Sequence, residues 1–185
     1  MLLQYLNTAL RDFKHYKTLG EKTFSQLEED DFFWQFNTEF NSIAILVNHL
    51  HGNMRSRWTD FLSTDGEKPW RNRDQEFEKK LQTKEAVLDH WKTGWLCVFN
   101  ALETLDETHT NTRILIRNQE HSILEAVNRQ VAHYAYHVGQ IVFIGRMVQG
   151  RNWKTLSIAK GASKKFNQQK FSKGKHSGSF TEDLK

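Results

Sequence analysis

His133 and His137 are four residues apart in the stretch AHYAYHVGQI, residues 132–141. On an α-helix, side chains at positions i and i+4 lie on the same face, with their Cβ atoms about 5–6 Å apart. Two imidazoles in this arrangement can each give one nitrogen to the same small cation, so the pair is a candidate metal site. The simpler alternative is two surface or capped histidines, and the pair taken alone does not exclude it.

The residues around this pair have the apolar spacing of a helix that packs in a bundle. Residues of the apolar seam follow one another at gaps of three and four: Leu124, Val127, Val131, Tyr134, Val138, Ile141, Gly145 and Val148. Ser122 lies three residues before Glu125, which is the pattern of a capping box, and Gly150 is a typical helix stop. The sequence therefore predicts one helix over residues 123–149.

The two histidines lie on a polar stripe beside the apolar seam. They come one residue before seam residues, so their stripe is rotated by about 100° around the helix. Gln130 and Gln140 share the stripe, and Ile144 continues it. A partly enclosed site could form there, at the edge of the core.

Three further stretches have the same amphipathic pattern, over residues 2–27, 41–62 and 84–105. The aromatic-rich segment 31–37, DFFWQFN, joins the first two and is expected to pack over one end of the bundle. Four amphipathic helices with heptad-like seams predict an all-α fold, a four-helix bundle. Bundles of this kind often hold metal sites between facing helices.

Two connections stand out from the helical pattern. Residues 63–82, STDGEKPWRNRDQEFEKKLQ, form a long polar connection that contains the only proline, Pro69. Such a segment is either functional or a surface crossover, and the sequence does not choose between the two. Residues 106–121 include TRILIR, whose alternation of polar and apolar residues predicts one extended strand.

The length of 185 residues suits one domain with a sizeable core. The formal net charge of +4 is misleading, because residues 151–185 hold nine Lys or Arg and two acids, which leaves −3 on the first 150 residues. We therefore expect a helical domain over residues 1–150 and a basic C-terminal extension over residues 151–185. The first part of the extension could dock on the bundle, and disorder is expected from about Gln168.

Composition also limits the partners. No apolar run approaches the roughly 20 residues of a membrane span, and the N-terminus does not have the pattern of a signal peptide. Cys97 is the single cysteine and is expected to be a buried, unreactive thiol. These features favour the cytoplasm. Nucleic-acid binding is disfavoured, because the bundle is acidic and the basic tail is more simply solvated.

A third ligand could come from the helix over residues 41–62, which holds His49 and His51. These two positions lie about 200° apart around the helix axis, so they cannot both face one site. His51 is slightly nearer the centre of the apolar face, whereas His49 shares a more polar flank with Asn53 and Arg57. The helical wheel alone does not choose between them.

The motif NHLHGNM, together with HYAYHVGQI, resembles the DinB/YfiT-like superfamily. The resemblance covers roughly residues 1–150 and is closest to an uncharacterised branch. It implies a four-helix bundle, usually a homodimer, with a divalent metal held by three histidines. Carried over residue by residue, the implied ligands are His49, His133 and His137.

Three neutral histidines would leave a divalent metal with an open position, which is the catalytic rather than the closed structural pattern. Zinc, nickel, copper and iron(II) all suit imidazole ligands. Asn53 and Gln140 lie one helical turn from ligands and are candidates to orient them or to contact a small-molecule substrate. Arg57, Arg71 and Arg73 could hold an anionic substrate if the long connection folds over the site, although a solvated charge is the simpler interpretation.

The resemblance suggests three functions. The first is a transferase in which the metal binds a low-molecular-weight thiol, such as bacillithiol, and presents its thiolate to an electrophile. The second is a metal-dependent hydrolase, which needs a general base, although no Asp or Glu lies on the stripe of His133 and His137. The third is a non-enzymatic, stress-related bundle in which the metal is structural.

Overall fold

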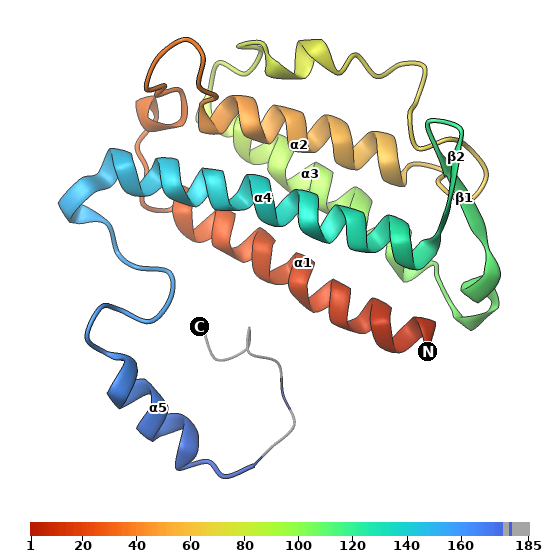
Figure 1. Ribbon diagram of the computed structural model, residues 1–185. Coiled ribbons are helices and arrows are strands. Elements are labelled where there is room, and N and C mark those ends of the chain that lie inside the picture. The colour runs from red at the N-terminus through yellow and green to blue at the C-terminus, as the bar shows by residue number, and fades with distance from the viewer. Residues whose placement is uncertain (176–177, 179–185) are drawn as a thin grey trace.

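The computed structural model describes residues 1–175 and 178, and this part of the chain is predominantly helical (Figure 1). Its α-helices are α1 (Leu2–Phe24), α2 (Ile43–Trp58), α3 (Lys84–Glu103), α4 (Ile123–Gln149) and α5 (Ser163–Phe171). A small antiparallel sheet consists of β1 (Arg113–Ile116) and β2 (Gln119–Ser122). The predominance of helix agrees with the predicted all-α class.

The four long helices pack against one another around a single core. α1 lies along α4 and α2 lies along α3, while contacts of α2 with α4 and of α1 with α3 join the two pairs (Figure 1). At the centre, the ring of Trp95 lies 6.0 Å from that of Phe13 and 5.4 Å from that of Tyr134. Apolar rings from α1, α3 and α4 thus fix the spacing of the helices.

α4 begins and ends where its sequence pattern predicts. The hydroxyl of Ser122 accepts a hydrogen bond from the backbone N–H of Glu125, and the Glu125 carboxylate accepts one from the backbone N–H of Ser122. This reciprocal capping box satisfies N–H groups that the first turn leaves unpaired. The other three long helices also exist as predicted, but each ends a few residues early. α2, for example, ends before Asp60, whose φ is +47°.

The strand predicted in TRILIR is present as β1, but it pairs with a second strand that the sequence did not indicate. The two-residue turn Arg117–Asn118 has φ angles of +55° and +59°, typical of the type I′ turn of tight hairpins. The carboxylate of Asp65 accepts hydrogen bonds from the backbone N–H groups of Arg117 (2.8 Å) and Asn118 (2.7 Å). The hairpin is thereby tied to the connection between α2 and α3.

The aromatic segment after α1 packs over the core less completely than expected. Phe32 is fully buried, with its ring 5.5 Å from that of Phe24. Trp34, Phe36 and the nearby Phe40 are exposed instead. One aromatic side chain of the segment therefore closes this end of the core, and others lie on the surface.

After α4 the chain contacts the segment that follows α1. The backbone N–H and C=O of Lys154 both bond to the side chain of Gln26, and Trp153 lies beside Gly145. α5 then extends to Phe171, so residues 168–171 are helical. The rest of the expected disordered end falls mainly on residues 176–177 and 179–185, outside the described residues. No helix in the described part has the length and hydropathy that a membrane span requires.

The buried hydrogen bond from Trp58 Nε1 to the hydroxyl of Tyr134, at 2.9 Å, joins α2 to α4 and predicts the cost of one substitution. Tyr134→Phe leaves the indole N–H of Trp58 buried without an acceptor, so we expect the free energy of unfolding to fall by about 1–3 kcal/mol. Urea unfolding of the metal-free protein measures the change. Tyr136→Phe is the control, because that side chain is exposed and its substitution should cost less than about 0.5 kcal/mol. Equal stability of the two variants would contradict the prediction.

Candidate metal centre

His49, His133 and His137 lie together where α2 faces α4. The ring of His49 is 5.3 Å from that of His133 and 4.8 Å from that of His137, and the two α4 rings are 4.7 Å apart. One ligand nitrogen from each residue lies within 4.8 Å of the other two. The i, i+4 pair on α4 therefore meets a third imidazole from α2, and the three side chains could hold a metal ion.

His51 is directed to a different helix. Its ring lies 4.3 Å from that of His90 on α3, and burial lowers its pKa to about 4. α2 packs against α3 on one side and α4 on another, so two histidines about 200° apart on α2 reach different neighbours. The structure thus places His49, and not His51, beside His133 and His137.

The separation of one pair of nitrogens in the cluster matches that around a tetrahedral metal. Nε2 of His49 lies 3.3 Å from Nε2 of His133. Two imidazole nitrogens that each bind zinc at about 2.0–2.1 Å with a tetrahedral angle are also about 3.3 Å apart. The donor set and this separation therefore fit a divalent ion.

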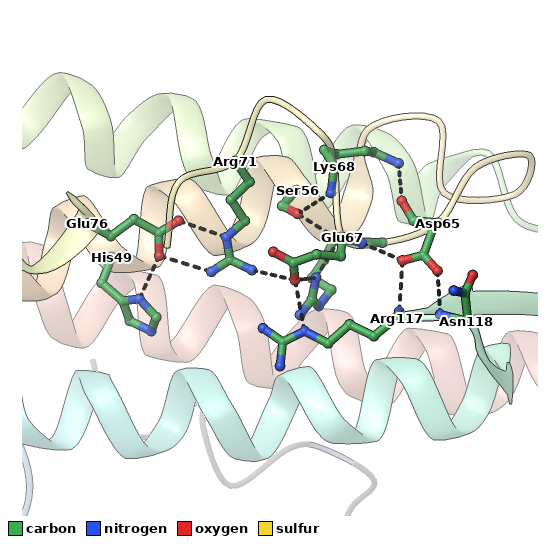
Figure 2. A network of polar contacts seen from close by, with 11 residues as sticks. His49, Ser56, Asp65, Glu67, Lys68, Arg71, Glu76, Arg117 and Asn118 are labelled. Carbon is green, nitrogen blue, oxygen red and sulfur yellow. Dashed lines mark hydrogen bonds and ion pairs between the residues drawn. The ribbon is translucent and has the colours of Figure 1, made fainter. Parts of the chain in front are cut away.

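The carboxylate of Glu76 sets the orientation of His49. Nδ1 of His49 donates to Oε2 of Glu76 at 2.9 Å, and Glu76 is buried in the 3₁₀ helix η2 (Asp74–Phe77) (Figure 2). Burial alone would raise the pKa of Glu76, but hydrogen bonds from His49 and Arg71 outweigh it and lower the pKa. Glu76 is therefore ionised near neutral pH. It holds the His49 proton on Nδ1, which leaves the lone pair of Nε2 for a metal.

Gln140 orients His137 in a similar way. The Gln140 amide oxygen accepts a hydrogen bond from Nδ1 of His137 at 3.0 Å, which leaves Nε2 of His137 unprotonated. Burial is the main cause that lowers the pKa of His137 to about 4 and that of His133 to about 3, and neighbouring imidazoles add to the effect. Both rings are therefore neutral at pH 7, the form that binds metal.

Two residues of the long connection, Glu76 and Phe77, were not among the sequence-based candidates. Phe77 stacks on His49 with its ring centroid at 4.6 Å and an interplanar angle of 26°. The length of the connection was the only signal in the sequence, and it did not distinguish a surface crossover from a functional segment. Glu76 and Phe77 both contact His49, so η2 covers the cluster from the α2 side.

The interpretation of Arg57 and Arg71 as solvated charges is wrong. Their side chains are 5% and 2% exposed, because the connection folds back over α2. Arg71 donates from Nε and Nη2 to the two oxygens of Glu76, at 2.7 and 2.9 Å. Arg57 bonds to the carbonyl of Gly66 and, at 3.1 Å, to the carboxylate of Glu67. A buried guanidinium needs such partners, because an unpaired buried charge is very costly.

A cavity of about 390 Å³ opens beside the histidines. Four predicted candidates line it, namely Asn53, Arg57, Arg71 and Arg73, whereas Gln140 bonds to Nδ1 of His137 outside the cavity lining. Three further residues line the cavity although no sequence motif marked them, namely Arg117, Arg129 and Tyr136. None of the residues that line this cavity is Asp or Glu.

Comparison with family models gives a match over most of the chain. A family model described as "Protein of unknown function (DUF1572)" matches residues 2–162, which include the whole cluster. Searches of curated proteins and of solved structures give no significant match.

Gly52 permits the close approach of Glu76 to α2, so its substitution should disturb the site. A Cβ built at Gly52 would lie 2.2 Å from Oε1 of Glu76, inside van der Waals contact. We expect Gly52→Ala to lower the free energy of unfolding by about 1–3 kcal/mol, as overpacking does. Urea unfolding of the metal-free protein measures the change.

Gly139→Ala is the matched control within α4. In the described part of the chain, no atom beyond the local helix backbone lies within 4 Å of a Cβ built at Gly139, so helix propensity should stabilise this variant by about 0.5–1 kcal/mol. If both variants were stabilised, the close packing of Glu76 against α2 would be refuted.

Proposed function

The chain belongs to the DUF1572 family, and we propose that it is a metal-dependent enzyme of the DinB/YfiT-like type, with its metal on His49, His133 and His137. One observation carries the proposal. Three imidazoles line one cavity, and two of them have the far nitrogen engaged by an acceptor, Glu76 or Gln140. Such outer contacts are typical of metal-binding histidines, because they orient the ring and set its tautomer.

The architecture supports the same assignment. The four long helices, taken as a four-helix bundle, present the third histidine from the second helix and the pair from the fourth, which is the arrangement that the DinB/YfiT-like resemblance implies. A cytoplasmic homodimer would accompany that assignment. Zinc, nickel and iron(II) are the candidate ions, since all three accept imidazole ligands.

We propose transfer of a low-molecular-weight thiol, such as bacillithiol, as the reaction. His49, His133 and His137 would hold the metal ion, which would supply the positive charge that stabilises a thiol as its thiolate near neutral pH. The thiol sulfur forms a bond to an electrophilic carbon, the leaving group departs with its electron pair, and the thiol proton passes to solvent. The cavity that the three histidines line gives the electrophile access to the sulfur. It also holds the electrophile near the sulfur.

The cavity wall favours thiol transfer over hydrolysis. Hydrolysis by metal-bound water needs a general base, and no residue lining the cavity is a carboxylate. Glu76, whose carboxylate contacts His49, is held by His49 and by Nε and Nη2 of Arg71, so it is not free to accept a proton from water. Thiol transfer needs no such base once the thiol is deprotonated.

The metal proposal predicts the effect of removing each ligand. Purified wild-type protein should hold about one divalent ion per chain after dialysis. His49→Ala, His133→Ala and His137→Ala should each lose it, and Glu76→Gln should weaken binding by about 10- to 100-fold. Elemental analysis of the dialysed proteins and a competitive chelator titration measure these changes.

His51→Ala is the matched control, because His51 is a second histidine of α2 outside the cluster. It should keep its metal, and equal metal content in all the variants would refute the centre. Chelation should leave the far-UV circular dichroism intact, as expected for a catalytic metal. Unfolding on chelation would instead favour the structural, non-enzymatic alternative.

The reaction proposal predicts metal-dependent consumption of a model electrophile. With bacillithiol and monochlorobimane, the protein should accelerate displacement of chloride by sulfur, which fluorescence follows directly. We expect the rate to fall by at least about 10²-fold in His133→Ala, since the site loses a ligand. His51→Ala should keep the wild-type rate. Metal-loaded protein that does not accelerate the reaction above the uncatalysed rate would count against thiol transfer. It would leave the metal centre itself untouched.

A further inference from the structure

The cavity beside the histidines carries an excess of positive charge. Five arginines line it: Arg57, Arg71, Arg73, Arg117 and Arg129. Two carboxylates, Glu67 and Glu76, form the ion pairs that the described residues offer to these arginines. Three of the arginines therefore pair with only these two carboxylates, which leaves an excess of positive charge.

Glu67 is divided among three guanidinium groups. Its Oε2 lies 3.1 Å from Nη1 of Arg57, 3.4 Å from Nη1 of Arg71 and 3.1 Å from Nε of Arg117 (Figure 2). Glu76 is bound by Arg71 and also accepts a hydrogen bond from Nδ1 of His49. A single carboxylate group cannot neutralise three cations, so the wall stays positive after its own ion pairs have formed.

Arg73 and Arg129 have no carboxylate partner within ion-pair distance among residues 1–175 and 178. The guanidinium of Arg73 lies over the ring of Phe77, 5.2 Å from its centroid, on the segment that covers His49. Arg129 is four residues before His133 on α4, so it follows the same face of the helix as the metal-binding pair. Two uncommitted guanidinium groups therefore line the same cavity as the histidines.

Buried polar atoms on the same wall also lack partners. Oδ1 of Asn53, Oε1 of Gln130 and Nε of Arg57 have no hydrogen bond to any described residue, and these residues are 6%, 3% and 6% exposed. Buried groups of this kind are normally satisfied by water or by a ligand. The amide oxygens of Asn53 and Gln130 need hydrogen-bond donors, and the Nε–H of Arg57 needs an acceptor.

We propose that this cavity binds a small organic oxyanion, a carboxylate or a phosphate, that also carries hydroxyl or amine donors. Guanidinium groups pair with planar or tetrahedral oxyanions through two N–H bonds at once, and Arg73 and Arg129 are free to do so. The donors of the ligand satisfy Asn53 and Gln130. The volume of about 390 Å³ lies in the range of small-molecule sites.

The inference names the substrate class of the proposed reaction, and it rests on the proposed function only in taking this cavity as the place of that reaction. The positive wall holds the anionic group, while the reacting part of the molecule faces the three histidines at the end of the same cavity. Anion binding itself needs only the arginines. It can therefore be tested on metal-free protein, where failure of the metal proposal does not affect the result.

The test uses the full-length protein without metal, at constant ionic strength. Chloride is replaced in separate arms by inorganic phosphate or by l-malate, and binding is followed by calorimetry and by the shift in melting temperature. We expect at least one oxyanion to bind and to stabilise the fold, and the stronger arm identifies the phosphate or carboxylate class. The dimethyl ester of malate, which keeps the hydroxyl but not the charge, should bind at least tenfold more weakly than malate.

Arg73→Gln and Arg129→Gln should each weaken the better oxyanion by about tenfold or more. Among the described residues neither arginine has an ion pair to lose, and Arg73→Gln loses only the contact of Arg73 with the Phe77 ring, so both variants should melt within a few degrees of the wild type in chloride. Arg146→Gln is the matched control, an exposed arginine of α4 that does not line the cavity, and it should bind like the wild type. Absence of binding in both arms, or equal binding by the three variants, would overturn the proposal.

Discussion

The buried carboxylate of Glu76 is the contact on which the site depends. Its Oε2 accepts hydrogen bonds from Nδ1 of His49 and Nη2 of Arg71, and its Oε1 accepts one from Nε of Arg71. A carboxylate with these partners stays ionised in spite of its burial, because hydrogen bonds to the charged form offset the loss of solvent. The same contacts hold the tautomer of His49 and the position of the long connection. The approach of Glu76 to α2 requires a residue without a side chain at Gly52.

The long connection between α2 and α3 forms a wall of the site because successive ion pairs and hydrogen bonds hold it in place. Asp65 holds the hairpin turn, Glu67 joins arginines from α2, the connection and the hairpin, and Glu76 joins the connection to His49 (Figure 2). Each link satisfies a polar group that would otherwise be buried at high cost. The helices provide the histidines, and this network determines the charge and outline of the cavity next to them.

The helices and the α4 histidine pair were predictable because both depend on local spacing. Apolar residues at gaps of three and four place α4 over residues 123–149, and the same geometry puts His133 and His137 on one face. The hairpin was only half predictable. β1, with the sequence RILI, is rich in β-branched and apolar residues and alternates in burial, whereas β2, with the sequence QEHS, has no such pattern and exists through its pairing with β1.

By itself, the sequence determined the helical class, the seam of each long helix and the two histidines of α4. The choice between His49 and His51 came from a family resemblance and not from the helical pattern. Helical periodicity gives the angle between two side chains on a helix, but it does not say which neighbouring helix each side chain contacts. Only the tertiary structure decided that α4 faces His49, that Glu76 completes the site, and that Arg57 and Arg71 are buried. These contacts join residues up to 84 positions apart. They arise because packing brings distant groups together and burial then requires each charge to find a partner.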